Sequence, residues 1–221
     1  MAYSGSDIQE GAGLLYNYLL IVRFALTNLV AFALLVAAYL QGWLDGVLNA
    51  HLMELSVFIF LVFLYGLVIC GAKIWHHSVE INTLKNGKPD PESRAGRYLR
   101  HTAGANPDSR SIHLDTMRLK LTDGIVVVRH IANGLVFLGL IGTVIGFIIA
   151  LSGVNPSAAT QVENAAAMVS TLINGMSVAL YTTLVGAVLY VWLNVNYRLL
   201  TTGTVDLIAS IVEASESRGR T

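Results

Sequence analysis

Four long runs of apolar residues restrict this chain to a membrane. They lie within residues 14–40, 55–75, 109–151 and 160–200. Each run is long enough for a helix that crosses a bilayer, which takes roughly 20 residues for about 30 Å of hydrocarbon. Apolar side chains make up 54% of the 221 residues and charged side chains only 13%, which is not a soluble globular composition. We therefore expect an all-α integral membrane protein with four transmembrane helices.

Lys and Arg are distributed unevenly over the connections between these runs. The segment from His76 to about His130 holds nine of them, whereas residues 41–54 and 152–167 hold none. Cytoplasmic segments near membrane spans carry the excess of Lys and Arg. The distribution predicts that the basic segment and both termini are cytoplasmic.

The third and fourth helices are longer than a bilayer requires. Asn106-Pro107 is typical of a helix start, and an unbroken helix over residues 109–151 would reach about 64 Å. In the fourth helix, apolar character continues to Leu200. We expect both helices to extend into the cytoplasm. The extension of the third helix should offer an apolar stripe to its neighbours at Ile112, Met117, Leu121 and Val128.

Stripes of small residues run along the third and fourth helices. In lipid, a missing side chain lets a second helix backbone come close. Two interpretations are open: the stripes only pack helices, with threonines bonded to their own backbone carbonyls, or they also present hydroxyls to a shared space. The third helix carries Gly139, Gly142, Thr143, Gly146 and Ala150, and the fourth carries Gly175, Ala179, Thr182 and Gly186, with Thr183 at the edge.

The sequence holds no pattern for catalysis or cofactor binding. There are no paired carboxylates within a span, no Ser/His/Asp arrangement and no glycine-rich phosphate loop, so we expect neither catalytic residues nor an enzyme. Nothing supports nucleic-acid binding. His76, His77 and Glu80 resemble a metal spacing without a further ligand, so we expect no metal. Cys70 is expected to be a small buried side chain.

An ion pathway would need an acidic side chain from another protein chain. A proton or sodium pathway requires a titratable or coordinating group at membrane depth. The cores of the third and fourth spans contain no Asp or Glu and supply only hydroxyls.

Three arginines form a separate candidate surface. Arg94, Arg97 and Arg100 recur every three residues in the basic segment. They could form a cytoplasmic basic face toward anionic membrane lipid or a partner protein. A solvated face beside the membrane is the alternative.

The third and fourth spans together resemble the paired signature helices of the MotA/TolQ/ExbB proton-channel family. The resemblance covers about residues 109–200. Its motifs are Ile131-Ala132, Leu138-Gly139-Leu140-Ile141-Gly142-Thr143-Val144-Ile145-Gly146, and Gly175 to Gly186 with Thr183. It implies a homopentamer in the bacterial cell inner membrane around two copies of a single-span subunit like MotB, ExbD or TolR. In such assemblies a gradient of H⁺ or Na⁺ drives rotation of one component inside the other.

The resemblance also implies roles for individual residues. Family partners carry an aspartate that ring threonines face, and Thr143 and Thr183 match those ring positions, with Thr182 beside them. The stripe glycines and Ala179 would pack the helices. The sequence departs from the family pattern at Val178, where ExbB carries a glutamate, and at Val136 and Trp192, where prolines are expected. The partner's acid is then the only obvious proton carrier.

This interpretation divides the chain into three parts. Residues 1–75 form peripheral transmembrane helices, residues 76–108 form a cytoplasmic connection, and residues 109–221 form the channel-lining helices with their extensions and tail. Two other functions are weighed against the ring. A four-span scaffold without transport would use the glycines for packing only. A solitary small transporter lacks support, because the chain shows no clear inverted repeat and no intramembrane acid.

Overall fold

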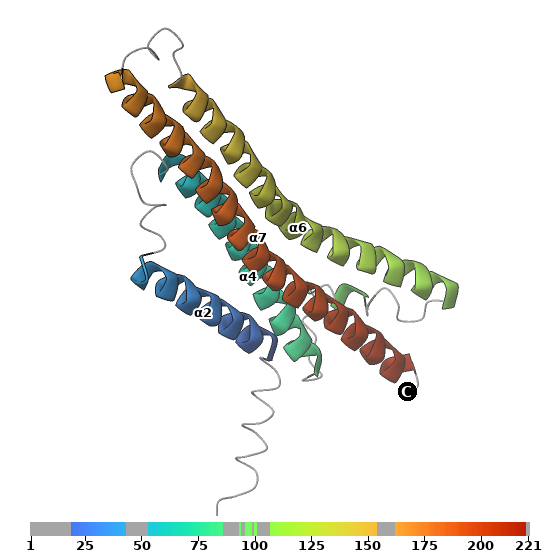
Figure 1. Ribbon diagram of the computed structural model, residues 1–221. Coiled ribbons are helices and arrows are strands. Elements are labelled where there is room, and N and C mark those ends of the chain that lie inside the picture. The colour runs from blue at the N-terminus through green and yellow to red at the C-terminus, as the bar shows by residue number, and fades with distance from the viewer. Residues whose placement is uncertain are drawn as a thin grey trace, which may run out of the picture. The chain divides into compact units, whose positions relative to one another are not determined.

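The computed structural model describes residues 19–42, 53–85, 93, 96–98, 100, 107–153 and 162–219. Almost all of the described residues are helical, with no strand among them, and Figure 1 shows the four long helices. Each has a stretch long and apolar enough to cross a membrane. The predicted four-helix membrane architecture is thus confirmed. The helices are α2 (Leu19–Leu40), α4 (Met53–Lys85), α6 (Pro107–Ser152) and α7 (Val162–Gly219).

α6 begins where the sequence predicts, and α7 extends beyond the apolar run that stops at Leu200. α6 begins at Pro107, since proline lacks a donor that the first helical turn would leave unpaired anyway. α7 does not end near Leu200 but continues to Gly219. With 46 and 58 residues, α6 and α7 both far exceed one membrane span.

The chain forms two compact units. Unit 1 comprises Met1–Leu29, Val68–Val128 and Val195–Thr221, and unit 2 comprises Val30–Leu67 and Arg129–Asn194. Each of the four helices therefore contributes one stretch to each unit.

An apolar cluster in unit 1 explains why α7 continues beyond Leu200. Leu207 and Ile211 of α7 are fully buried against Met117 and Leu121 of α6. Tyr98 belongs to the same cluster. Met117, Leu121 and Val128 are buried, as the predicted stripe required, but Ile112 is 65% exposed, so the prediction was wrong for that residue.

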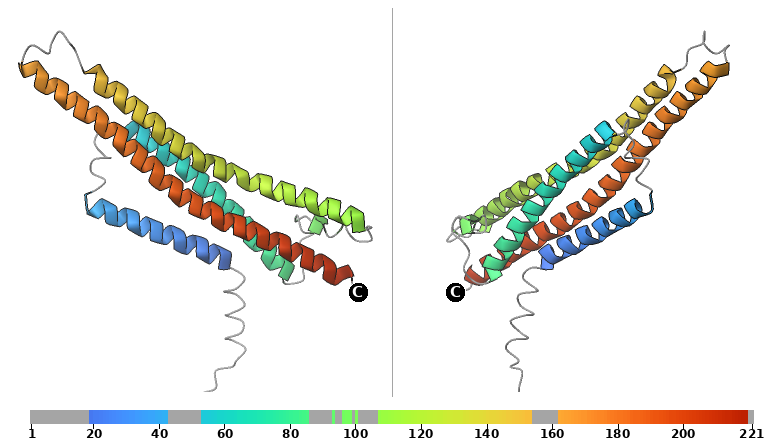
Figure 2. Two further views of the ribbon diagram at one scale, coloured as in Figure 1. Left: turned by 45° about the vertical axis from the view of Figure 1, so that its right-hand side comes forward. Right: turned by 90° about the vertical axis from the view of Figure 1, so that its left-hand side faces the viewer.

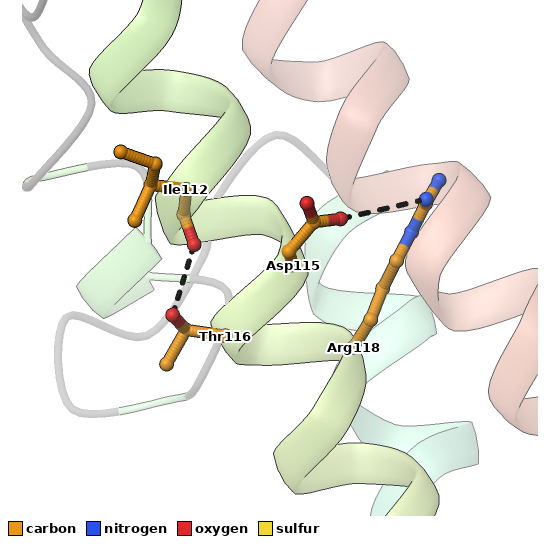
Figure 3. Close-up of polar contacts among 4 residues, drawn as sticks. All are labelled: Ile112, Asp115, Thr116 and Arg118. Atoms are coloured by element: carbon orange, nitrogen blue, oxygen red, sulfur yellow. Dashed lines mark hydrogen bonds and ion pairs between the residues drawn. The ribbon is translucent and has the colours of Figure 1, made fainter.

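Polar contacts on the exposed side of the α6 end in unit 1 contribute little to this packing. Arg118 Nη1 lies 3.9 Å from Asp115 Oδ1, and the Thr116 hydroxyl donates to the Ile112 carbonyl at 2.9 Å (Figure 3). Exposed ion pairs of this kind stabilise a fold by about 0–1 kcal/mol. The apolar cluster therefore holds this end of α6.

Reciprocal amide hydrogen bonds join α2 to α7 within unit 1. Asn28 Nδ2 donates to Asn196 Oδ1 at 2.8 Å, and Asn196 Nδ2 donates to Asn28 Oδ1 at 3.3 Å. Asn196 is fully buried, and the Cys70 thiol of α4 donates to its carbonyl at 3.5 Å. Cys70 is buried, as predicted. Three helices thus meet at one polar point.

Unit 2 is packed by apolar side chains from α4, α6 and α7. Phe63 of α4 and Trp192 of α7 form a tilted aromatic pair with ring centroids 5.0 Å apart. A methyl group on Gly66 would lie 2.7 Å from Leu193 Cδ2 and 2.9 Å from Ile131 Cγ2, so these side chains would have to shift to admit it. The described residues of α2 include none that is buried.

We predict that Asn28→Ala and Asn196→Ala destabilise the protein in a coupled way. Either change leaves the other amide without its partner at membrane depth. Coupling between membrane helices through such bonds is about 0.6 kcal/mol on average and reaches about 1.7 kcal/mol. A double-mutant cycle on the free energy of unfolding in detergent measures it. Asn133→Ala on the exposed side of α6 is the matched control. Strictly additive effects of the pair would contradict the prediction.

Candidate functional site at the contact of α6 and α7

The backbones of α6 and α7 touch in unit 2. A methyl group in place of the Gly146 hydrogen would lie 2.5 Å from the Ala179 nitrogen and 2.6 Å from the Gly175 oxygen. At Gly186 it would lie 2.7 Å from the Leu135 oxygen. A methyl carbon does not approach non-bonded backbone atoms this closely, so only glycine fits at these two positions. We call this contact the α6/α7 interface.

The contacting pairs show that the two helices run antiparallel here. Gly139 of α6 lies against Thr182, Thr183 and Gly186 of α7, and Gly146 lies against Gly175 and Ala179. Residue numbers rise along α6 as they fall along α7, and Figure 2 shows the two helices side by side over this stretch. The α6/α7 interface brings together Gly139, Gly142, Gly146 and Ala150 of α6 with Gly175, Ala179, Thr182 and Gly186 of α7.

Thr182 lies inside the α6/α7 interface. It is fully buried, and its hydroxyl donates to the Val178 carbonyl at 2.9 Å, with the Ala179 carbonyl at 3.2 Å. A methyl group at Gly142 would collide with the Thr182 hydroxyl. Thr182 therefore fills the space that Gly142 leaves open.

Thr183 lies at the edge of the interface and reaches across it. Its hydroxyl oxygen is 3.2 Å from the Gly139 carbonyl of α6 and 3.2 Å from the Ala179 carbonyl of its own helix. A hydroxyl has one hydrogen to donate and two lone pairs that accept. The two carbonyls share that hydrogen, and the residue is otherwise exposed.

Thr143 lies one turn beyond Gly139 on α6. Residues four apart share a helix face, so Thr143 lies on the same face as Gly139. The Thr183 hydroxyl contacts the Gly139 carbonyl on that face. Its hydroxyl donates to the Leu140 carbonyl at 2.6 Å. Both threonine hydroxyls thus donate to backbone carbonyls, as the packing interpretation expects, and keep lone pairs that can accept a hydrogen bond or coordinate a cation.

The site contains hydroxyls and carbonyls but no carboxylate. Between Asp123 and Asp206 the only Asp or Glu is Glu163. Val178, on the face of α7 that carries Thr182, is buried. Within the described ranges, no three His, Cys, Asp or Glu side chains are placed to hold a metal. The site can bind water, a protonated acid or a cation, but it holds no group that carries a proton itself.

Comparison with known proteins identifies the family. The model of the MotA/TolQ/ExbB proton channel family matches residues 103–213, half of the chain. The chain belongs to this family. Comparisons with curated proteins and with solved structures gave no match.

Membership in the MotA/TolQ/ExbB family assigns the chain to a group of multi-pass membrane proteins that act as proton channels in energy-transducing complexes. The matched range includes all of the α6/α7 interface and all three candidate threonines. Arg97 and Arg100 precede it and belong to unit 1, and Arg94 lies outside the described residues.

The contribution of α4 to this part of the MotA/TolQ/ExbB chain was not predicted. Leu55 of α4 lies 3.1 Å from where a methyl group on Gly142 would be, and Gly66 of α4 lies against Leu193 and Ile131. The available signal was an isolated glycine in an apolar run, which often marks a close approach. Spacing along α4 alone could not show which helix approaches.

We predict opposite effects of alanine at two glycines of α6. Gly146→Ala forces backbone against backbone and should lower the free energy of unfolding by about 1–3 kcal/mol. Gly134→Ala is the matched control, because no atom lies within 4 Å of its added methyl group, and alanine favours a helix over glycine. It should be neutral or slightly stabilising. Unfolding of the full chain in detergent, followed by circular dichroism, measures both. Equal effects would contradict the close approach.

Proposed function

We propose that this chain is the ring subunit of an ion-driven motor or energy-transducing complex. It would conduct protons, or sodium ions, where it meets a single-span partner that carries an aspartate. The observation that carries the proposal is the pair of threonine hydroxyls at the edge of the α6/α7 interface, in a chain of a proton channel family. The ring would contain five copies around two partners, so the two partner acids would occupy unequal positions.

The missing carboxylate supports a partner subunit. An ion at membrane depth needs a coordinating or titratable group. The spans of α6 and α7 provide hydroxyl and carbonyl oxygens only. A proton carrier must then come from another chain, and a single-span partner with one acid is the simplest source.

The two threonine hydroxyls suit both states of such an acid. While their hydrogens are donated to the Leu140 carbonyl and to the carbonyls near Thr183, their lone pairs can accept from a protonated carboxyl group. When the carboxyl group loses its proton, a hydroxyl can rotate and donate to it. Hydroxyl and carbonyl oxygens are also suitable ligands for a partly dehydrated sodium ion.

The exposed apolar side chains of α6 and α7 support assembly with further copies. Phe137 and Val144 of α6 and Leu180 and Leu184 of α7 are more than half exposed in the single chain. A ring would cover part of this surface, and lipid would cover the rest. α2, with no buried residue among those described, is suited to the lipid-facing periphery.

The orientation follows from the basic residues. The positive-inside rule assigns both termini and the extended ends of α6 and α7 to the cytoplasmic side of a bacterial inner membrane. Arg97 and Arg100 would then lie on the cytoplasmic side.

We predict that Thr183→Val and Thr143→Val reduce ion flux by about tenfold or more, since each removes a hydrogen bond to a charged or protonated group, roughly 1.5–3 kcal/mol. Thr183→Ser keeps the hydroxyl and should retain most of the flux. The complex is purified from native membranes through a tag on this chain, and proton and sodium entry into proteoliposomes is measured with selective dyes.

The matched control is Thr202→Val, which removes an exposed hydroxyl of the same helix that donates to its own Arg198 carbonyl at 3.1 Å. It should leave the flux unchanged. If Thr183→Val and Thr143→Val assemble normally and conduct as well as the control, the hydroxyls are not in the pathway. The scaffold function would then be favoured.

A further inference from the structure

Unit 1 contains a polar pocket with a volume of about 460 Å³. α4 supplies Lys73, His76, His77 and Glu80, the helical stretch 96–98 supplies Arg97, and α6 supplies Gly124. We call it the Lys73 pocket. None of its residues belongs to the α6/α7 interface, so an inference from it does not depend on ion conduction.

The charges of the Lys73 pocket favour an anion. Lys73 and Arg97 are cationic, and Glu80 is the single carboxylate among the described residues of the wall. Within the described part of the chain, neither Lys73 nor Arg97 forms an ion pair, whereas Glu80 has a polar contact of its own. Two cations in a concave site without a paired anion attract oxyanions strongly.

Gly124 brings the Lys73 ammonium group against the backbone of α6. A methyl group on Gly124 would lie 3.3 Å from Lys73 Nζ, and no other atom lies within 4 Å of it. The bare backbone therefore forms part of the wall next to the ammonium group.

His77 of α4 contacts α7 beside the Lys73 pocket. Its Nδ1 lies 3.2 Å from the Thr204 hydroxyl oxygen, and that hydroxyl donates its hydrogen to the Leu200 carbonyl at 2.9 Å. His77 is buried and lines the pocket, so this contact with Thr204 holds one side of the pocket wall in place.

The Lys73 pocket lies where α4 leaves the apolar part of the membrane. Lys73 is the first charged residue after the apolar run that begins at Leu55. Trp75 follows and is 58% exposed, as is typical of tryptophan at the level of lipid headgroups. Phosphate groups of phospholipids lie at this level, and basic pockets between membrane helices bind them.

We propose that the Lys73 pocket binds a phosphate oxyanion, with Lys73 and Arg97 as the charged donors. An anionic phospholipid headgroup is the favoured source, because Lys73 and Trp75 are typical of the level at which lipid headgroups lie. Inorganic phosphate has the same chemistry and is the other source.

The test compares two probes on the purified full chain in non-ionic detergent. Phosphatidylglycerol retention is measured by native mass spectrometry against phosphatidylcholine, and inorganic phosphate binding is measured by titration calorimetry. Lys73→Gln and Arg97→Gln should each weaken binding about tenfold, while Lys73→Arg keeps the charge and most of the binding. Lys120→Gln, at an exposed cation of α6 outside the pocket, is the matched control and should bind normally.

The outcomes separate the two sources. Selective loss of phosphatidylglycerol in Lys73→Gln and Arg97→Gln supports a lipid site, and selective loss of inorganic phosphate supports a free-phosphate site. If neither probe binds, or if Lys120→Gln weakens binding as much as the pocket variants, the proposal is wrong. Should a Gln variant fail to fold, the unmodified chain and Lys73→Arg still decide whether either probe binds.

Discussion

The direct contact between the backbones of α6 and α7 determines the rest of the candidate site. Between helices in lipid there is no hydrophobic driving force, so close van der Waals packing must hold them together. Gly146 and Gly186 permit that packing only where a backbone faces them, which fixes the register of the pair. With the register fixed, the Thr183 hydroxyl falls at the Gly139 carbonyl rather than one turn away.

Different kinds of residue pack the helices in the two units. In unit 2 small residues bring the backbones of α6 and α7 together, whereas in unit 1 large side chains such as Leu207 and Ile211 form the apolar cluster. Unit 1 also holds buried polar groups that pair across helices, with Asn28 bonded to Asn196 and His77 bonded to Thr204. Directional polar bonds fix relative helix positions where side chains rather than backbones meet.

Properties of a single helix could be predicted from the sequence, and properties that need several segments could not. Apolar length predicted four helices, Pro107 marked the start of α6, and period 3.6 placed the glycines of α6 on one face. The end of α7 was not predicted, because the apolar run stops at Leu200 and polar residues such as Thr201, Thr202 and Asp206 follow it. The Lys73 pocket combines residues from three distant segments, so no local pattern could indicate it.

Two adjacent threonines of α7 take different positions at the α6/α7 interface. Thr182 is buried within it, and Thr183 lies at its edge. Successive helical residues point about 100° apart, so burial of Thr182 against Gly142 turns Thr183 to the rim. Val178 lies one turn before Thr182 on the same buried face and is only 5% exposed. A carboxylate at that position would be desolvated between packed helices without a cationic partner nearby, at a cost of several kcal/mol. An apolar residue at this position therefore suits the tight packing of α6 against α7.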